Sequence, residues 1–477
     1  MTAQLGEVDV PATTVSCAGC HGSEGRGKTE GGISPSNITW QHLTKPYGHS
    51  HANGRRHGPY NESAFIRSVV NGIDPAGNEL AVAMPRYRMS PKEMADLIAY
   101  LKRIETDLDP GLTETSIKVG TLLPLTGPVA EAGQAIKEVL TAYFADLNSR
   151  GGVYNRRIEL RVGEAASDKA LTAANAKRLI EDEQIFSLVA GFTWGADREL
   201  AALAGDSEVP FIGPATLYPQ TDFPLNRYLF YLLPGLKDQM LALVSFAANK
   251  PELQKSRMAI VFPDTESNAN IAHAVEQHSK KGVWNSVSKV AYPPGSFDAV
   301  QLAAKLKQQK IDVLFFLGAG NEERVFLKQA EEINWTPTIF LLGSMIGRDL
   351  LNSVPVNFKN KIFLAYPTAP ADVAPAGVAE FRNLLENHKL NKRHTAAQLS
   401  ALAAAKILIE GLKLAGRDVS REKLVTALEG LYEFDTLLTP RVTFGPNRRT
   451  GARGAYVVAI DPEKKTLIAA SEWINVN

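Results

Sequence analysis

The sequence predicts a multidomain chain, with a small all-α domain followed by a two-lobed α/β domain. Three observations lead to this fold class. The chain has 477 residues, more than one compact domain usually holds. Both of its cysteines lie within the first 20 residues, and from residue 117 onward strand and helix patterns alternate in two successive series. The predicted boundaries are 1–108 for the first domain, 109–116 for a polar linker and 117–477 for the second domain.

A CxxCH motif at residues 17–21 marks the first domain. Covalent attachment of a c-type haem needs two thiols at this spacing, followed by an imidazole. Cys17 and Cys20 would bond the haem vinyl groups and His21 would bind the iron. A structural zinc site needs four ligands, and the chain has no second cysteine pair. A redox dithiol has no need of His21. The motif therefore predicts one covalent haem c and no disulfide.

The sixth iron ligand is predicted to be Met84, a thioether just before the helical pattern at 91–104. Met89 is the competing sulfur, whereas Met94 belongs to the apolar face of that helix. A His/Met haem suits electron transfer. A bis-histidine haem is the alternative, but the candidate histidines occupy a polar, Gly-rich stretch that predicts a solvated surface loop with at most a weak preference for metal. These residues are His42, His49, His51 and His57.

Residues 8–106 resemble a class I cytochrome c. The resemblance is carried by the CAGCHG motif, the Ile33-Ser34-Pro35 turn, residues 71–77, Met84-Pro85 and the closing helix around 97–102. It implies that a proline carbonyl accepts the ring N–H of the iron-binding histidine, and Pro35 matches that position. Such a bond fixes the tautomer and makes the other ring nitrogen a better ligand.

The rest of the chain reads as alternating strands and helices. The first series has strands at 117–124, 157–163, 186–190 and 209–214, with helices at 130–150, 168–183 and 195–205. The second has strands at 258–262, 288–292, 313–318 and 339–343. Of its three helices, one begins at 267, one runs through 307 and one begins at 321. Alternation of this kind favours right-handed βαβ units and parallel sheets, and two series predict two lobes.

About residues 116–470 resemble the type I periplasmic solute-binding proteins of the leucine/isoleucine/valine branch. The matching segments are 119–128, 148–153, 157–160, 191–195 and 213–216. The resemblance implies two lobes joined by three crossovers, near 234, near 366 and within 440–451, which close on a small molecule. No Gly-rich nucleotide motif stands at a strand-to-helix turn.

Ligand residues are predicted at strand ends, where open parallel sheets bind their ligands. Thr193, Trp194 and Gly195 lead from a strand into a helix, whose N-terminal N–H groups favour an anion. Ala215 and Thr216 match the second contact loop of the family.

The second lobe departs from the family pattern. The resemblance implies an acidic residue there for the ligand ammonium group, but the matching segment 342–347, which contains Ser344, has no carboxylate. Asp264 or Glu266 could replace it. The predicted ligand is therefore not a plain branched-chain amino acid but a small organic solute, with a carboxylate or an aromatic compound as candidates.

Composition limits the partners. A formal net charge of +1 gives no reason to expect nucleic acid or an anionic membrane surface. The sequence has no apolar run of about 18 residues, so we expect no transmembrane helix. The segment after Met1 lacks the pattern of a signal peptide. Because haem c is attached outside the cytoplasm, we expect a periplasmic protein whose leader has been removed.

The predicted function is one-electron transfer through the haem, coupled to binding of a small solute in the periplasm. Redox partners would be a periplasmic dehydrogenase, another cytochrome or an oxidase. The alternative is the substrate-binding component of an ABC importer, with an ABC permease as partner and the haem domain as an accessory. Enzymatic activity is not expected, because a coordinatively saturated haem cannot accept a hydride and no second cofactor motif is present.

Overall fold

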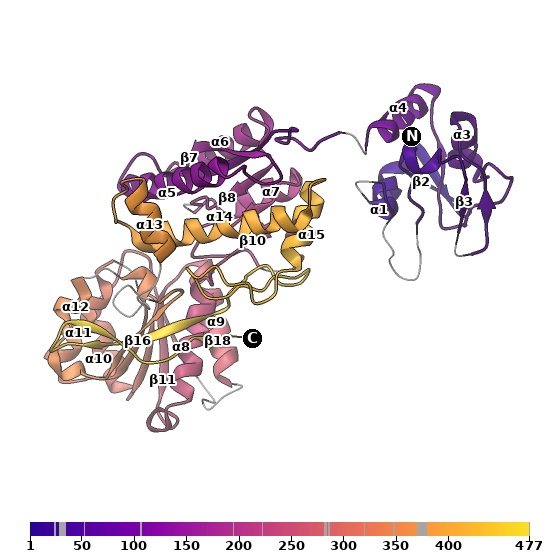
Figure 1. The fold of residues 1–477 in the computed structure, drawn as a ribbon. Helices are drawn as coiled ribbons and strands as arrows, with labels where there is room; N and C mark the ends of the chain where they lie inside the picture. The colour runs from indigo at the N-terminus through magenta and orange to yellow at the C-terminus, as the bar shows by residue number, and fades with distance from the viewer. Residues whose placement is uncertain are drawn as a thin grey trace. The chain divides into compact units, whose positions relative to one another are not determined.

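The structure is a computed structural model and describes residues 1–22, 25–27, 35–51, 53–104, 107–193, 195–221, 223–280, 284, 287–318, 320–346, 349–369 and 379–476. The chain divides into two compact units, Met1–Leu108 and Asp109–Asn477 (Figure 1). The first unit is small and mainly helical, and the second holds two large sheets.

The described residues of the first unit form four α-helices, with a 3-10 turn at Ala12–Val15. The helices are α1 (Cys17–His21), α2 (Trp40–Leu43), α3 (Glu62–Asn71) and α4 (Pro91–Arg103). Helix α4 begins at a capping box, in which the Ser90 side chain and the Glu93 side chain each bond the other residue's backbone N–H. Its apolar face buries Met94, Ile98 and Leu101 in a core shared with α3. The closing helix thus packs through the face predicted from its periodicity.

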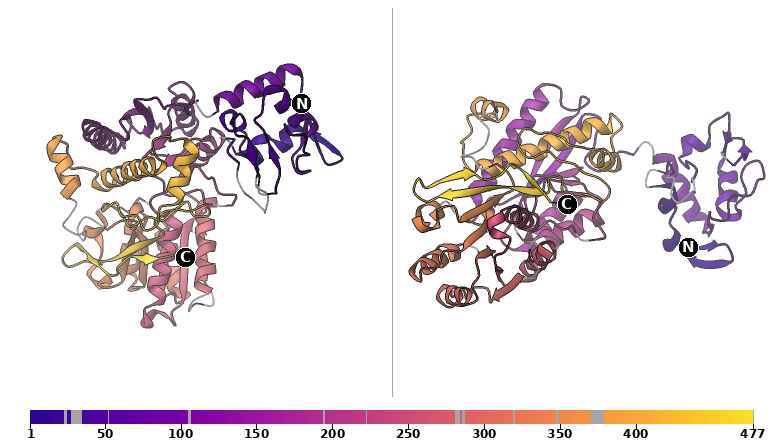
Figure 2. Two further views of the ribbon diagram at one scale, coloured as in Figure 1. Left: turned by 45° about the vertical axis from the view of Figure 1, so that its right-hand side comes forward. Right: turned by 90° about the horizontal axis from the view of Figure 1, so that it is seen from below.

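The first unit also contains strands, which an all-α description leaves out (Figure 2). Strands β1 (Thr2–Leu5), β2 (Val8–Pro11) and β5 (Arg86–Arg88) make an antiparallel sheet in the order β2-β1-β5. Strands β3 (His49–Ser50) and β4 (Arg56–His57) form a hairpin. Each of these strands has two to four residues, too few for an alternating pattern to stand out in the sequence.

The first lobe of the second unit is built on a parallel sheet in the order β10-β9-β8-β6-β7. Its strands are β6 (Ser116–Leu123), β7 (Arg157–Glu164), β8 (Ser187–Val189), β9 (Phe211–Ile212) and β10 (Leu229–Phe230). Its helices are α5 (Ala130–Ser149), α6 (Lys169–Glu181), α7 (Asp197–Asp206), α13 (Ala379–Asn387), α14 (Thr395–Ala415) and α15 (Arg421–Glu429).

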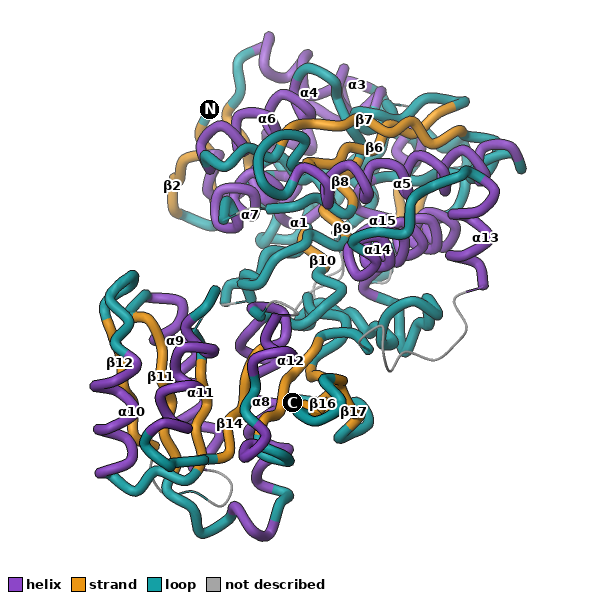
Figure 3. Tube along the Cα trace, turned by 90° about the vertical axis from the view of Figure 1, so that its left-hand side faces the viewer, coloured by secondary structure: helices purple, strands orange, loops and turns teal. Residues whose placement is uncertain are grey.

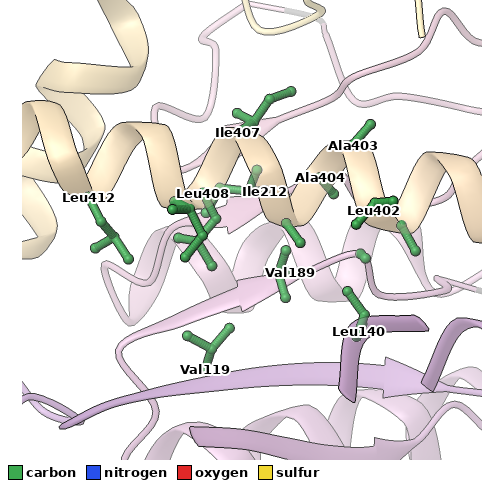
Figure 4. Close-up of a cluster of buried hydrophobic side chains, with 14 of the residues drawn as sticks. Val119, Leu140, Val189, Ile212, Leu402, Ala403, Ala404, Ile407, Leu408 and Leu412 are labelled. Atoms are coloured by element: carbon green, nitrogen blue, oxygen red, sulfur yellow. The ribbon is translucent and has the colours of Figure 1, made fainter. Parts of the chain in front are cut away.

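Helix α14 is the core helix of this lobe (Figure 4). Its Leu408 is fully buried and belongs to the same apolar cluster as Val119, Val189 and Ile212 of the sheet. A Cβ on Gly213, whose φ is +67°, would come within 2.5 Å of Ala404, so a glycine lets the end of β9 approach the helix. By length and composition α14 is the one described helix that could cross a membrane, but 61% of its apolar window is buried in the lobe.

The second lobe is built on an eight-stranded sheet in the order β12-β11-β13-β14-β15-β16-β17, with β18 paired to β16 (Figure 3). Strands β11 to β15 are parallel, and β16 to β18 are antiparallel additions. The strands are β11 (Met258–Pro263), β12 (Val287–Tyr292), β13 (Val313–Phe316), β14 (Thr338–Leu342), β15 (Ile362–Tyr366), β16 (Gly454–Asp461), β17 (Thr466–Ala469) and β18 (Ile474–Asn475). The helices are α8 (Leu236–Ala248), α9 (Glu266–Lys280), α10 (Ala299–Gln308), α11 (Glu322–Glu332) and α12 (Asp349–Ser353), with 3-10 turns at Pro251–Leu253, Gly343–Met345 and Val356–Phe358. The strand and helix ends predicted for both lobes lie within two residues of these bounds.

The chain passes between the lobes after β10, after β15 and before β16. The first and third of these segments run side by side, because Gly451 donates its N–H to the Tyr231 carbonyl at 2.8 Å and Ala452 to Leu232 at 3.1 Å. Part of the second segment, 370–378, lies outside the described residues.

Residues 109–116, predicted to be a polar linker, are anchored to the first lobe. Leu112 is buried in the core of the first lobe, and Arg156 donates to the Thr113 carbonyl at 2.8 Å. The sequence of this segment is mostly polar because its buried contact with the lobe is made by a single leucine, Leu112.

Candidate functional sites

The CxxCH motif forms helix α1, which is just over one turn long. Residues three apart lie on one face of a helix, so Cys17 and Cys20 share a side. Both are free thiols, Cys17 half-buried and Cys20 exposed. The helix ends at Gly22, whose φ is +76°. Two adjacent free thiols beside the last helical residue, His21, are the donor arrangement that covalent haem attachment requires.

His21 is 8% exposed, and its Nδ1 lies 2.7 Å from the Ser36 carbonyl oxygen. The prediction that Pro35 provides this acceptor is wrong by one residue. The Pro35 carbonyl instead lies against Gly27, where a Cβ would approach it to 2.2 Å. Burial lowers the pKa of His21, and the bond to Ser36 opposes this shift in part. A neutral imidazole with Nδ1–H directed at a carbonyl has its lone pair on Nε2, the form that binds iron.

The predicted axial thioether lies in the same cluster as the motif. Met84 is half-buried and packs, together with Cys17, against the core of the first unit. Met89 packs there as well, so both sulfurs stay candidates, whereas Met94 is a core residue of α4. The neutral buried imidazole, the free thiols and these two thioethers fit the haem expected of this motif.

Tyr87 is a neighbour of the motif that sequence reasoning missed. Its hydroxyl donates to the Val15 carbonyl at 2.5 Å. Burial raises its pKa, and Cys17 and Cys20 add to the shift. Position 87 alternates with polar Arg86 and Arg88 in β5, but a three-residue strand is too short for that alternation to reveal Tyr87 in the sequence.

The histidines predicted to be solvated are clustered instead. His57 is 7% exposed, and its Nε2 lies 2.9 Å from Nε2 of His51. The rings of His42 and His49 are 4.5 Å apart, and those of His49 and His57 are 5.0 Å apart. His57 is buried, unlike the other three, and hairpin β3–β4 places it opposite His49, eight residues earlier in the chain.

In the first lobe, Thr193 and Ala215 lie at neighbouring strand ends. The Thr193 N–H donates to the Ala215 carbonyl at 3.4 Å, and Phe192 pairs with Ala215 as an isolated bridge. Thr193 is buried, and its hydroxyl lies 2.7 Å from an Asp197 carboxylate oxygen. The Thr216 hydroxyl accepts the Tyr218 N–H at 2.9 Å. Both hydroxyls therefore have partners within their own loops.

The helix that follows, α7, does not present a bare N-terminus. Asp197 and Glu199 occupy its first turn, and such acids already neutralise the positive end of the helix dipole. Burial raises the pKa of Tyr218, and Asp197 adds to it. Gly195 has φ +82° with open space beside it, and Trp194 lies outside the described residues. This loop favours an anion less than predicted.

In the second lobe, Asp264 is exposed at the end of β11, and its N–H donates to the Tyr292 carbonyl at 2.7 Å. Glu266 begins α9 and forms a 3.1 Å ion pair with Arg198 of α7. This pair joins the two lobes, so the strand ends that carry α7 and α9 face each other. Ser344 donates to Oε1 of buried Gln239 at 3.2 Å.

The second lobe also places carboxylates beyond the end of another strand, outside segment 342–347. Glu322 and Glu323 begin α11, the helix that follows β13 in the chain. The Tyr292 hydroxyl donates to Glu322 at 2.6 Å. Glu323 is 2% exposed, and burial raises its pKa. Both acids follow a continuous apolar strand and so lie where parallel sheets bind ligands, whereas the family resemblance pointed to segment 342–347.

Two protein families match the chain. The periplasmic binding protein family matches residues 116–466, and the cytochrome c family matches residues 12–105. The first match alone covers more than half of the chain, and together they account for both units.

Known relatives agree with the larger match. The chain is 25% identical over 347 residues to the Leu/Ile/Val-binding protein BraC3 of Rhizobium johnstonii, covering 70% of this chain and 89% of the relative. Among solved structures, a fatty acid ABC transporter substrate-binding protein from Thermomonospora curvata has a TM-score of 0.61 at 17% identity, covering 78% of this chain and 95% of that one. A branched chain amino acid ABC transporter from Thermus thermophilus with bound valine has a TM-score of 0.59 at 17% identity, covering 76% and 98%. The chain belongs to the periplasmic binding protein family, and a cytochrome c domain precedes its binding domain.

Proposed function

We propose that this protein carries single electrons in the periplasm through one covalent haem c, and that solute binding between its lobes regulates this activity. The observation that carries the proposal is the presence on one chain of a CxxCH helix with a buried, neutral histidine and of a two-lobed binding fold. The haem would supply reversible one-electron chemistry. Its electron partners would be a periplasmic dehydrogenase, another cytochrome or an oxidase.

The first unit's own residues would hold and tune the haem. Cys17 and Cys20 would attach it, and His21 would bind the iron through Nε2 while Ser36 holds Nδ1. Met84 is our proposal for the other axial position. Burial of His21 keeps it neutral and excludes water from its bond to Ser36.

We propose that the solute is a small organic molecule with a positively charged group. Asp197 lies at the facing edge of the first lobe, and Glu322 lies at that of the second. A buried ammonium group needs such counter-charges. This proposal of a cationic group replaces the expectation of an anionic ligand. The first compounds to test are leucine, isoleucine and valine, because the names of the relatives include them.

A thermal-shift screen followed by a redox titration tests the coupling. A solute that binds only the folded state raises the melting temperature of the second unit. With that solute bound, we expect the haem midpoint potential to shift. A saturating solute that leaves the potential unchanged would show two independent modules and refute the coupling.

The axial ligand has a separate test. Replacing Met84 with Ala should open the iron to carbon monoxide, seen as a change in the haem absorbance spectrum. The matched Met89→Ala variant should behave as the parent protein. If Met89→Ala opens the iron and Met84→Ala does not, the assignment is reversed.

A second candidate function is the substrate-binding component of an ABC importer, with the haem unit as an accessory. Its support comes from solved relatives whose names include ABC transporters. Stimulation of a cognate permease's ATPase by the solute-loaded protein, equal for haem-loaded and Cys17→Ala/Cys20→Ala forms, would favour it over electron transfer.

A further inference from the structure

Hairpin β3–β4 gathers three histidine rings on one side of the first unit. His49 and His57 are register partners in the antiparallel pair, so their side chains are close neighbours. His51 is two residues beyond His49 and therefore points to the same face. A turn between the strands, in which His51 donates its N–H to the Arg55 carbonyl at 2.9 Å, brings His51 over His57. The sequence spacing H-x-H…H thus becomes a compact cluster only through the hairpin.

The hydrogen bonds of two of these rings direct both lone pairs at one point. Nδ1 of His57 lies 2.7 Å from the Gly58 carbonyl and must carry a proton there. Nε2 of His51 accepts from Arg55 at 3.1 Å, and its Nδ1 lies 3.5 Å from the Ser36 hydroxyl. Nε2 of His51 is therefore an acceptor, and it lies 2.9 Å from Nε2 of His57. A cation shared between these two nitrogens, either a proton or a metal ion, would satisfy both of them.

We infer that His51 and His57 form a binding site for a divalent transition-metal ion. Two nitrogens 2.9 Å apart, each about 2.0 Å from a metal, subtend about 90° at it, the cis angle of tetragonal Cu²⁺ or Ni²⁺ and smaller than tetrahedral Zn²⁺ prefers. The second-nitrogen bonds to Gly58 and Ser36 are of the kind that orient metal-binding histidines.

His49 favours a metal over a shared proton. Its Nε2 is buried and has no hydrogen-bond partner in the described part of the chain, and its ring centre is 5.0 Å from that of His57. A proton would satisfy only His51 and His57, whereas a metal with open positions can also take His49 after a ring rotation. In the described residues no set of three or more His, Cys, Asp or Glu side chains is already placed around one metal, so the site starts from two ligands.

The residues around His51 and His57 determine how a metal ion would reach the pair and how tightly it would bind. His49 and His57 line an open hollow of about 830 Å³, together with Lys45 and Arg56. Burial lowers the pKa of His51 to about 4, with Arg55 and the neighbouring histidines adding to the shift and Asp74 opposing it. Arg55 competes for the His51 lone pair, and Lys45, Arg55 and Arg56 repel a cation, so we expect Arg55 to weaken binding.

Titration of the haem-loaded full chain with NiCl₂ and CuCl₂ in a calorimeter tests the site. We expect one equivalent bound by the parent protein, and at least a tenfold loss of affinity in His51→Gln and His57→Gln. His273→Gln, which removes an exposed histidine on α9, is the matched control and should bind as the parent. Cu²⁺ electron paramagnetic resonance should show hyperfine coupling to at least two nitrogens.

A parent protein that binds no metal, or His51 and His57 variants that bind as the parent does, would overturn the inference, and the first result would leave a shared proton as the account of the contact. Should either histidine variant misfold, Arg55→Gln decides the question, because it leaves both rings in place. We expect it to tighten binding several-fold, and an unchanged or weaker affinity would count against the site.

Discussion

The two units position their functional groups in different ways. In the first unit, Cys17, Cys20 and His21 all come from one five-residue helix. In the second, the candidate groups come from loops that follow separate strands of two sheets, as Thr193 and Glu322 do. A site on one helix turn is set by local spacing, whereas a site between strand ends depends on the whole topology.

The two units also differ in the size of their hydrophobic cores. Eleven described apolar side chains form the buried cluster of the first unit, which has 108 residues. The largest cluster of the first lobe alone has 38. A unit with so small a core depends on whatever else it buries, and the obvious contribution is a large apolar cofactor. The second unit is held by the larger apolar clusters around its own sheets.

The largest effect should follow removal of both haem-attaching thiols. In Cys17→Ala/Cys20→Ala we expect the first unit to lose its cooperative fold, because the covalent cofactor no longer completes its core. Limited proteolysis should then digest residues before about 108 and spare the rest. The melting transition of the second unit and its solute affinity should not change.

A first unit that resists protease without haem would show that its eleven-residue core is sufficient. That outcome would remove the contrast between the units, although haem attachment itself would stand on the parent protein's absorbance.

The reverse experiment weakens the second unit. Leu408→Ala deletes a fully buried side chain of α14, which should cost about 3 kcal/mol. The calorimetric transition of the second unit should move to lower temperature, while the haem absorbance and its own melting stay as in the parent. Leu414→Ala, at an exposed position of the same helix, is the control and should change little. A shift of both transitions by Leu408→Ala would mean that the units unfold together.

These contrasts explain which features the sequence could predict. The haem motif and the lobe elements are local patterns, so Cys17, His21 and the alternating strands and helices could be read from spacing and period. Ser36 could not be told from Pro35, because which carbonyl faces His21 depends on how Gly27 packs against the loop.

Features made by strand pairing and by tertiary contacts were harder to predict. The histidine cluster needs the register of β3 with β4, and two-residue strands have no period to detect. Glu322 follows a strand that was predicted correctly, but choosing between it and segment 342–347 needs the Tyr292 contact, which spans 30 residues. The polar composition of residues 109–116 predicts a linker, but it does not show that Leu112 is buried and holds the segment against the first lobe.

A smaller effect is expected at Asp74, the charged centre of the loop after α3. Its carboxylate accepts from the Ala76 and Asn78 N–H groups at 2.9 Å and pairs with Arg55 at 2.8 Å. Burial opposes ionisation, but these bonds outweigh it and lower the pKa below the ordinary 3.8. The stabilisation is therefore present above about pH 4 and is lost as pH falls through the folded-state pKa.

Asp74→Ala should cost the first unit about 2 kcal/mol at pH 7 and remove that acid-dependent loss of stability. Urea unfolding followed by haem absorbance at pH 7 and pH 3 measures both. A parent and variant with the same pH dependence would show that another carboxylate controls acid stability. The stability of the second unit should not change in this variant, as expected if the two units unfold independently.

The smallest effect concerns the contact between the lobes. Arg198 and Glu266 are 68% and 70% exposed, so their ion pair should contribute less than 1 kcal/mol. Because the pair joins α7 of one lobe to α9 of the other, it can form only when the strand ends face each other. Arg198→Ala and Glu266→Ala should each weaken solute binding by about fivefold at most, and the double variant should be no weaker than either single one. The difference from the parent should disappear in 0.5 M salt, since an exposed pair is screened. A salt-independent loss in Glu266→Ala alone would instead mean that this carboxylate contacts the solute, and the edge of the second lobe would then bind through Glu266 as well as through Glu322.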